Sequence, residues 1–67
     1  MVKYHLERRM EEVATPWGPV SVKVAMAGDR VVRRVPEFEA CAQLARAEGV
    51  PVRDILAAAA AVIEEDD

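Results

Sequence analysis

The amino-acid sequence predicts a small α+β fold, in which an antiparallel three-stranded sheet is followed by two helices packed on one face of it (β-β-β-α-α). In the first half of the chain, apolar residues alternate with other residues, which is the two-residue period of a half-buried strand. In the second half they recur every three to four residues, as on a helix with one apolar face. We expect one domain over residues 1–67, with the sheet in 3–35, helices in 36–48 and 51–64, and an acidic tail at 65–67.

The clearest strand runs from Val20 to Met26. The apolar residues of its inward phase are Val20, Val22, Val24 and Met26. Ahead of it, Thr15-Pro16-Trp17-Gly18 predicts a tight turn, because proline fixes one backbone angle and glycine tolerates a positive φ. After it, Ala27-Gly28-Asp29 predicts a tight connection into a third strand over Arg30 to Val35.

Residues 3–13 fit two patterns. As a strand, one face would carry Val2, Tyr4, Leu6 and Met10, with Arg8 as an odd charge among them. As a helix, one stripe would consist of Leu6, Met10 and Val13, and the many Glu and Arg residues favour a helix by propensity. Local rules leave the two patterns equal. The turn at Thr15 to Gly18 favours a strand paired antiparallel with Val20 to Met26, because such a turn joins two strands.

Both helices have clear sequence signals. Pro36 fits the first position of a helix, Glu37 and Glu39 suit its positive end, and Gly49 ends it. Its apolar face consists of Phe38, Cys41, Leu44 and Ala45. Pro51 opens the second helix, whose apolar stripe consists of Val52, Ile55, Leu56, Ala59, Val62 and Ile63. The short break between the helices predicts an abrupt corner.

Size and composition exclude several classes of protein. A chain of 67 residues buries only about 60% of the surface that its unfolded form exposes, so we expect self-association to stabilise it. One cysteine excludes an intrachain disulfide, and only His5 and Cys41 are strong zinc ligands. The longest low-charge run, 55–63, is about half of a membrane span. We expect a cytoplasmic protein that does not enter a membrane, because no export signal is seen.

The charge is unevenly distributed along the chain. The net charge is −3, yet residues 1–34 carry seven Lys or Arg against four acids, and 64–67 are all acidic. The basic half could contact an anion such as a nucleotide phosphate, although solvated charges on a sheet face are the commoner explanation. The negative net charge and the small number of aromatic residues disfavour nucleic acid as a partner.

Several strings in series carry a family resemblance. They are Thr15-Pro16-Trp17-Gly18, Val20-Ser21-Val22-Lys23-Val24-Ala25, Pro36-Glu37-Phe38-Glu39-Ala40-Cys41 and Gly49-Val50-Pro51-Val52-Arg53. Together these strings resemble the C-terminal segment of the CTP-dependent nickel insertase of nickel-pincer nucleotide cofactor biosynthesis, the LarC family. The family's own pattern has a tyrosine where Phe38 stands and an acid where Ala40 stands.

The resemblance implies insertion of nickel into a pyridinium-based, dithiocarboxylate-bearing nucleotide, with CTP hydrolysed alongside. It implies CTP with Mn or Mg as ligands, nickel as the transferred metal, and a homo-oligomer, with a trimer-based one favoured. The family protein is several times longer than this chain. We therefore expect a stand-alone domain that assists a larger insertase-like subunit and is not a complete enzyme.

Five residues are candidates for contacts. Lys23 and Arg8 are candidates for nucleotide binding, against the alternatives of a solvated lysine and of an arginine whose stem covers apolar surface. Glu37 and Glu39 are candidates for a bound metal, although they could simply offset the helix dipole. Trp17, in a turn, is a candidate interface anchor.

No catalytic residue is predicted. His5 has no nucleophile pattern to accompany it, and Cys41 lies on an apolar helix face, where a core residue is expected. The alternative function is a structural oligomerisation or protein-interaction module without nucleotide binding.

Overall fold

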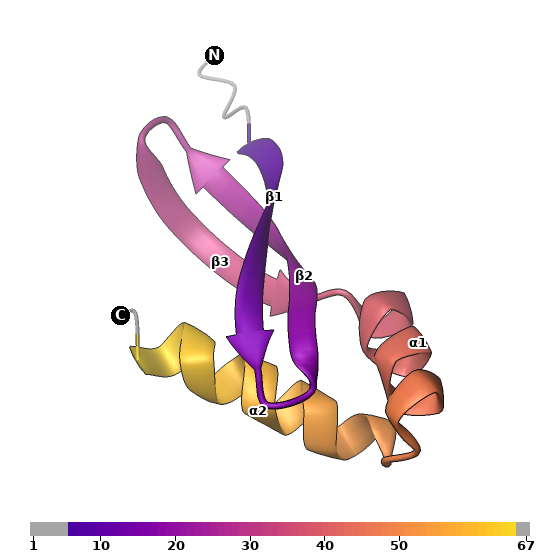
Figure 1. The fold of residues 1–67 in the computed structure, drawn as a ribbon. Coiled ribbons are helices and arrows are strands. Elements are labelled where there is room, and N and C mark those ends of the chain that lie inside the picture. Colours follow the sequence, from indigo (N-terminus) through magenta and orange to yellow (C-terminus); the bar gives the residue numbers. More distant parts are fainter. Residues whose placement is uncertain (1–5, 66–67) are drawn as a thin grey trace.

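The computed structural model describes residues 6–65 and has three antiparallel strands followed by two helices, which confirms the predicted order (Figure 1). The elements are β1 (Leu6–Thr15), β2 (Gly18–Ala27), β3 (Arg30–Pro36), α1 (Phe38–Glu48) and α2 (Val52–Glu65). The strands lie in the order β1-β2-β3, so the central strand is β2. Neither described helix is long and apolar enough to cross a membrane.

The turn between β1 and β2 is closed by hydrogen bonds of the Thr15 side chain. The Thr15 hydroxyl donates a hydrogen bond of 2.6 Å to the Gly18 carbonyl and accepts one of 3.3 Å from the Trp17 N–H. Gly18 has φ +135°, which favours glycine. The strand predicted at 3–13 is therefore confirmed over its described part, while its first residues and His5 lie outside the described range.

The first helix begins later than predicted. Pro36 is the last residue of β3, opposite Val22, and not the first residue of a helix. The Glu37 N–H donates to the Ser21 carbonyl at 2.9 Å, which continues the sheet ladder for one residue. Glu37 is extended and acts as the N-cap of α1, and its carbonyl accepts the first helical bond from Cys41 at 3.1 Å. Proline suits the end of a strand because it has no N–H to donate.

The corner between the helices is as abrupt as predicted. Gly49 adopts a left-handed conformation with φ +69°, and the Val50 N–H donates to the Ala45 carbonyl at 3.1 Å. The second helix extends to Glu65, so it includes the first residue of the predicted acidic tail. The rest of that tail, 66–67, lies outside the described residues.

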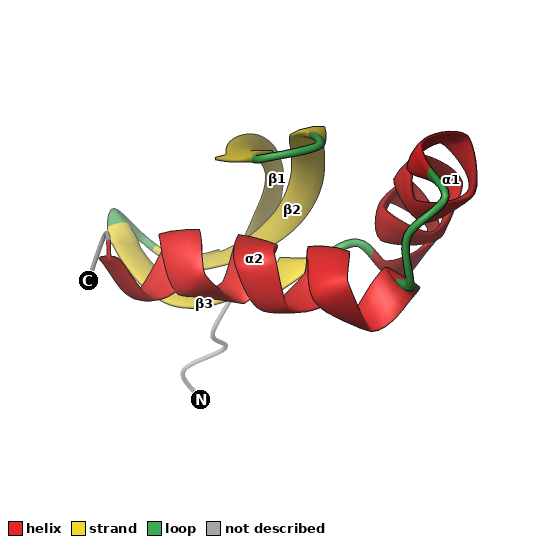
Figure 2. Cartoon of the chain, turned by 60° about the horizontal axis from the view of Figure 1, so that its bottom comes forward, coloured by secondary structure: helices red, strands yellow, loops and turns green. Residues whose placement is uncertain are grey.

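The core lies between one face of the sheet and both helices (Figure 2). Its buried residues are Val13, Val20, Val22, Val24 and Met26 from the strands and Cys41, Ala45, Ile55 and Ala59 from the helices. The inward phase predicted for β2 is thus confirmed. The opposite face of the sheet has no described helix over it.

Arg8 and Met10 share one face of β1, as predicted, and this face is turned away from the helices. The pairs Arg8–Ala25 and Met10–Lys23 place these residues on the helix-free face, whereas Val13, opposite Val20, lies in the core. The turn sets this register, because pairing Thr15 with Gly18 puts the odd-numbered residues of β1 opposite the valines of β2. The alternation of residue types along β1 does not reveal that Thr15 pairs with Gly18, so it could not show which face of the strand is buried.

A β-bulge interrupts β3. Ala25 pairs with Arg33 but Met26 pairs with Val31, so Val32 is an extra residue without a partner on β2. The bulge leaves Val32 57% exposed. The molecule is elongated, with extents of 50 × 22 × 15 Å, and the tip of the β2–β3 hairpin lies away from the helices (Figure 1).

Candidate functional site

Strand register gathers cations on the helix-free side of the sheet. Two rows of paired residues cross this side, and we call them together the basic face: Arg8, Ala25 and Arg33 in one row, and Met10, Lys23 and Val35 in the other. Each cation is flanked by apolar side chains in the same row. Successive side chains of β2 point to opposite sides of the sheet, so Lys23, between the buried Val22 and Val24, lies on the basic face.

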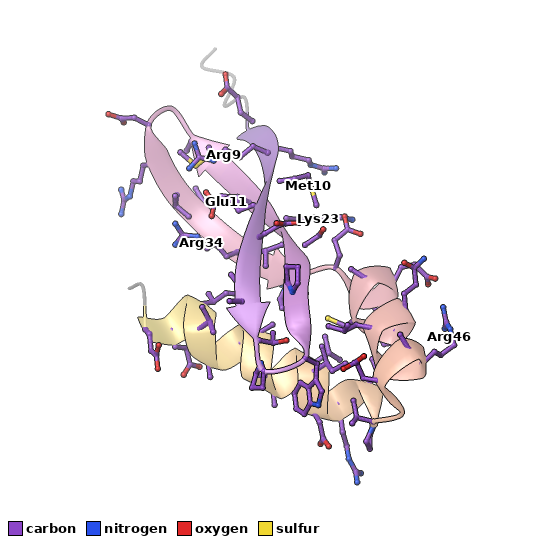
Figure 3. The ribbon with its side chains drawn as sticks, viewed as in Figure 1. Arg9, Met10, Glu11, Lys23, Arg34 and Arg46 are labelled. Carbon is purple, nitrogen blue, oxygen red and sulfur yellow. The ribbon has the colours of Figure 1, made fainter. Side chains whose placement is uncertain are left out.

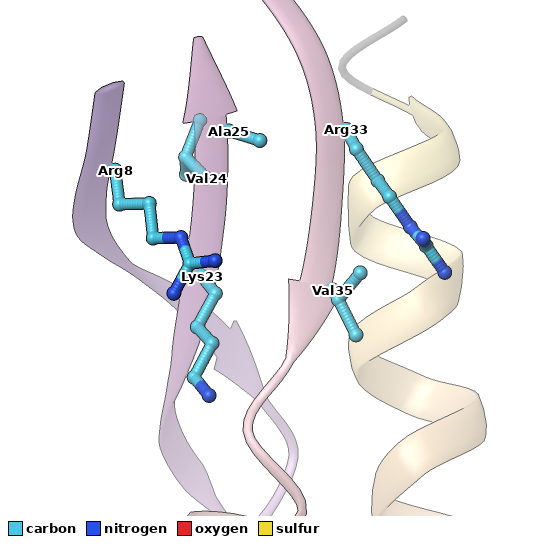
Figure 4. Close-up of a pocket in the computed structure, with 6 residues that line it drawn as sticks. All are labelled: Arg8, Lys23, Val24, Ala25, Arg33 and Val35. Carbon is cyan, nitrogen blue, oxygen red and sulfur yellow. The ribbon is translucent and has the colours of Figure 1, made fainter. Parts of the chain in front are cut away.

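An open depression of about 370 Å³ lies on the basic face and is shown in Figure 4. Its lining consists of Arg8, Lys23, Val24, Ala25, Arg33 and Val35. The side chains of Arg8 and Lys23 run close together from neighbouring strands, and Arg33 projects from β3. Among residues 6–65, no carboxylate lies within ion-pair distance of Arg8 or Arg33. The depression therefore presents cationic donors to an anion.

Lys23 and Glu37 lie next to each other, although one was predicted to contact nucleotide and the other metal. The Lys23 Nζ is 4.0 Å from Glu37 Oε1, and the lysine side chain is 63% exposed. An exposed pair at this distance is weak, so both groups remain available to a ligand. Glu37 makes no side-chain capping hydrogen bond to the described helix, which leaves its carboxylate at the rim of the basic face.

Glu39 lies apart from this group. Its carboxylate is 3.6 Å from Arg46 Nη2 on the same helix, and both side chains are exposed. Within the described chain, no three His, Cys, Asp or Glu residues lie close enough together to hold a metal ion. Mg²⁺ and similar ions are often bound by one or two carboxylates together with substrate phosphates. Glu37 beside Lys23 fits that arrangement, and Glu39 does not.

Trp17 and Cys41 occupy the helix-facing side of the molecule. Trp17 is half-buried and packs against the core, so part of its ring remains accessible to a partner. Its role as an interface anchor stays a prediction. Cys41 lies in the core, as expected, and burial raises the pKa of its thiol. A buried thiol of raised pKa is a poor nucleophile at neutral pH.

Sequence reasoning missed Arg33 as a candidate. Arg33 and Arg34 are neighbours on β3, and they point to opposite sides of the sheet. Without knowledge of the bulge at Val32, counting forward from the turn at Gly28 assigns them to the wrong sides. Counting back from Val35 gives Arg33 its correct side. That signal was present in the sequence, although nothing in it showed which count to use.

Comparison with known proteins identifies the family. Residues 1–56 match the family model described as nickel insertion protein. The chain belongs to this family. A protein of Myxococcus xanthus named for nickel insertion is 46% identical over 72 residues, which include 98% of this chain. The pyridinium-3,5-bisthiocarboxylic acid mononucleotide nickel insertion protein of Lactiplantibacillus plantarum is 39% identical over 62 residues, or 92% of this chain.

A solved structure shows the same fold. LarC2, the C-terminal domain of a cyclometallase involved in the synthesis of the NPN cofactor of lactate racemase, superimposes with a TM-score of 0.77 at 37% identity, over 92% of this chain. The match covers 42% of the LarC2 chain. The chain spans 18% of the Myxococcus protein and 14% of the Lactiplantibacillus protein. It therefore corresponds to a small part of each relative.

Proposed function

We propose that this chain binds CTP together with a divalent metal on its basic face, and that it assists nickel insertion during assembly of the nickel-pincer nucleotide cofactor. The observation that carries the proposal is that Arg8, Lys23 and Arg33 line the same depression. Family membership and the likeness to LarC2 support the choice of pathway, and the choice of CTP follows from what the sequence resemblance implies. Nickel is the transferred substrate in this proposal, and the compartment is the cytoplasm.

The side chains of the basic face match the chemistry of a nucleoside triphosphate. Arginine can hold two phosphate oxygens at once, and lysine acts as a point charge. The apolar side chains of Met10 and Val35, both exposed beside the cations, can cover the flat surfaces of a sugar or base. A divalent ion would share the phosphate oxygens and the Glu37 carboxylate, and it would neutralise part of the triphosphate charge.

The remaining chemistry belongs to another subunit in this proposal. The relatives are several times longer, and the basic face offers cations and one nearby carboxylate but no paired nucleophile and base among the described residues. A larger insertase-like subunit would bind the pyridinium substrate and complete the reaction. The present chain would supply nucleotide and assembly contacts.

Isothermal calorimetry of the 67-residue chain with CTP and Mn²⁺ tests the proposal. We expect saturable binding of CTP that weakens when EDTA removes the metal, and weaker binding of ATP and GTP. Absence of any saturable heat with CTP and Mn²⁺ at millimolar concentration would reject it.

The second candidate is a structural module that self-associates without binding nucleotide. It is favoured by the large apolar side chains left at the surface, Met10, Val32, Val35 and Phe38, of which Phe38 is 61% exposed. A closed symmetric oligomer would bury such residues, and a trimer-based one is preferred by the family resemblance. A chain that sediments as an oligomer but gives no heat with any nucleotide would favour this candidate over the first.

A further inference from the structure

The free edge of β1 is the surface that carries a further inference. In the sheet order β1-β2-β3, β1 pairs with β2 along its whole length, and no described strand pairs with its other edge. Alternate N–H and C=O groups of a ten-residue strand therefore point out of the sheet. Such an edge is a template for a strand from another chain.

The charges of β1 are arranged in mirror order about Met10. Arg8 and Arg9 precede it, and Glu11 and Glu12 follow it. If a second β1 runs antiparallel with the two Met10 residues facing each other, Arg8 lies opposite Glu12 and Arg9 lies opposite Glu11. By symmetry each of these pairs forms twice. Opposite charges in directly facing positions stabilise an antiparallel strand pair, and like charges destabilise it.

We propose that β1 pairs with β1 of a second copy in this register, which forms a continuous six-stranded sheet with a two-fold axis at Met10. This two-fold contact by itself closes a dimer, and it does not depend on nucleotide binding. Met10 is 55% exposed in the single chain and becomes the centre of the contact.

Symmetry leaves few other registers. Residues that face each other across an antiparallel pair lie on the same side of the sheet. The two-fold axis must therefore pass between a residue of β1 and the same residue of the second copy, and each alternative register is defined by that central residue. Centring it on Arg9 brings two arginines together and sets Glu7 against Glu11. Centring it on Glu11 brings two carboxylates together. Met10 is thus the centre that avoids like charges among these three.

The face of each residue agrees with this arrangement. Arg8 and Glu12 are both exposed on the helix-free side, and Arg9 and Glu11 both lie on the helix-facing side, where they are already 2.8 Å apart within one chain. In the dimer, the ion pair between Arg9 and Glu11 of one chain is replaced by pairs between Arg9 of one chain and Glu11 of the other. Both basic faces then lie on the same side of one sheet, and both helix layers lie on the other.

Substitution of Met10 by cysteine tests the register directly. Facing residues of antiparallel strands have Cα atoms about 4.5–5.5 Å apart, within reach of a disulfide. We expect Met10→Cys to form a covalent dimer in oxidised glutathione. In the control Ala14→Cys, the two new cysteines would lie about 26 Å apart along the sheet and remain uncrosslinked. Cys41 is buried and takes no part.

A charge swap tests the pairs. Glu12→Arg faces Arg8 of the second copy, and Arg8→Glu faces Glu12, so each variant alone should raise the dimer dissociation constant at least about tenfold in sedimentation. An equimolar mixture of the two variants restores both opposite-charge pairs and should sediment as a heterodimer. Monomeric parent protein, or a dimer that fails to crosslink at Met10→Cys, would overturn the interface, whatever calorimetry shows for CTP.

Discussion

Glu11 on β1 accepts a hydrogen bond of 3.3 Å from Arg34 on β3, so the two outer strands are joined across the central strand on the helix-facing side of the sheet. Arg9 donates a second bond, of 2.8 Å, to the other carboxylate oxygen (Figure 3). Partial burial of Glu11 alone would raise the pKa of its carboxyl. The hydrogen bonds from Arg9 and Arg34 and their positive charges outweigh burial and lower this pKa.

The lowered pKa of Glu11 predicts a pH-dependent stability. Because the folded state holds the carboxylate more strongly than the unfolded state does, the contribution is present at neutral pH and is lost as the pH falls through the folded-state pKa. Glu11→Gln should therefore lower Tm by a few degrees at pH 7 and leave it nearly unchanged in strong acid. Thermal circular dichroism between pH 2 and 7 measures the difference. Glu7→Gln, an exposed change on the same strand, should follow the parent protein throughout.

Arg33 and Lys23 should contribute to nucleotide affinity without contributing to the fold. Both side chains are exposed on the basic face, so their replacement by alanine should leave Tm almost unchanged. Each loss of a charged contact to phosphate should weaken CTP binding by roughly tenfold or more. Calorimetry with Mn²⁺ present makes the comparison, with Arg53→Ala on α2 as a matched control. Equal affinity in Lys23→Ala and Arg53→Ala would remove Lys23 from the site.

Ile55 is the residue whose truncation should cost the fold most. It lies on α2, is fully buried in the core, and is the largest of the completely buried side chains among the described residues. Ile55→Ala should destabilise the chain by about 2–5 kcal/mol, which is a large share of a small domain's stability. Leu56→Ala, at a half-buried neighbour, should cost clearly less. Urea unfolding followed at 222 nm ranks the two, and an equal loss would contradict the packing described.

Cys41 should report on the integrity of the core. Its thiol is fully buried and its pKa is raised by burial, so the native protein should react with a thiol reagent far more slowly than the urea-unfolded chain does. The absorbance released by an aromatic disulfide reagent follows the reaction. In Ile55→Ala the rate should increase. Fast labelling of the native parent protein would show that the space between α1 and β2 opens readily.

Much of the fold follows from local sequence signals. Three local patterns are each compatible with one kind of structure, and all three were predicted. They are the alternation of β2, the turn at Thr15 to Gly18 and the apolar stripe of α2. The start of α1 was placed wrongly at Pro36, because proline suits both the first turn of a helix and the end of a strand. The hydrogen bond from Glu37 to Ser21 decides between the two, and it depends on strands far apart in sequence.

The site was predictable only in part. Arg8 and Lys23 came from the sequence, and the sheet brings them together. Glu37 lies beside Lys23, whereas Glu39 pairs with Arg46 on α1. Arg33 joins the group because of a bulge that no local pattern reveals. Which side chains share a face of a sheet depends on register, and register is a property of pairing between strands.

The strict alternation of β2 separates two kinds of constraint on sequence change. Val20, Val22 and Val24 are held by packing, while Ser21, Lys23 and Ala25 point to a side that no described helix covers. Substitutions at the second set can change the chemistry of this exposed surface at almost no cost to folding. A chain built this way can acquire a new binding specificity through single mutations, with its scaffold unchanged throughout.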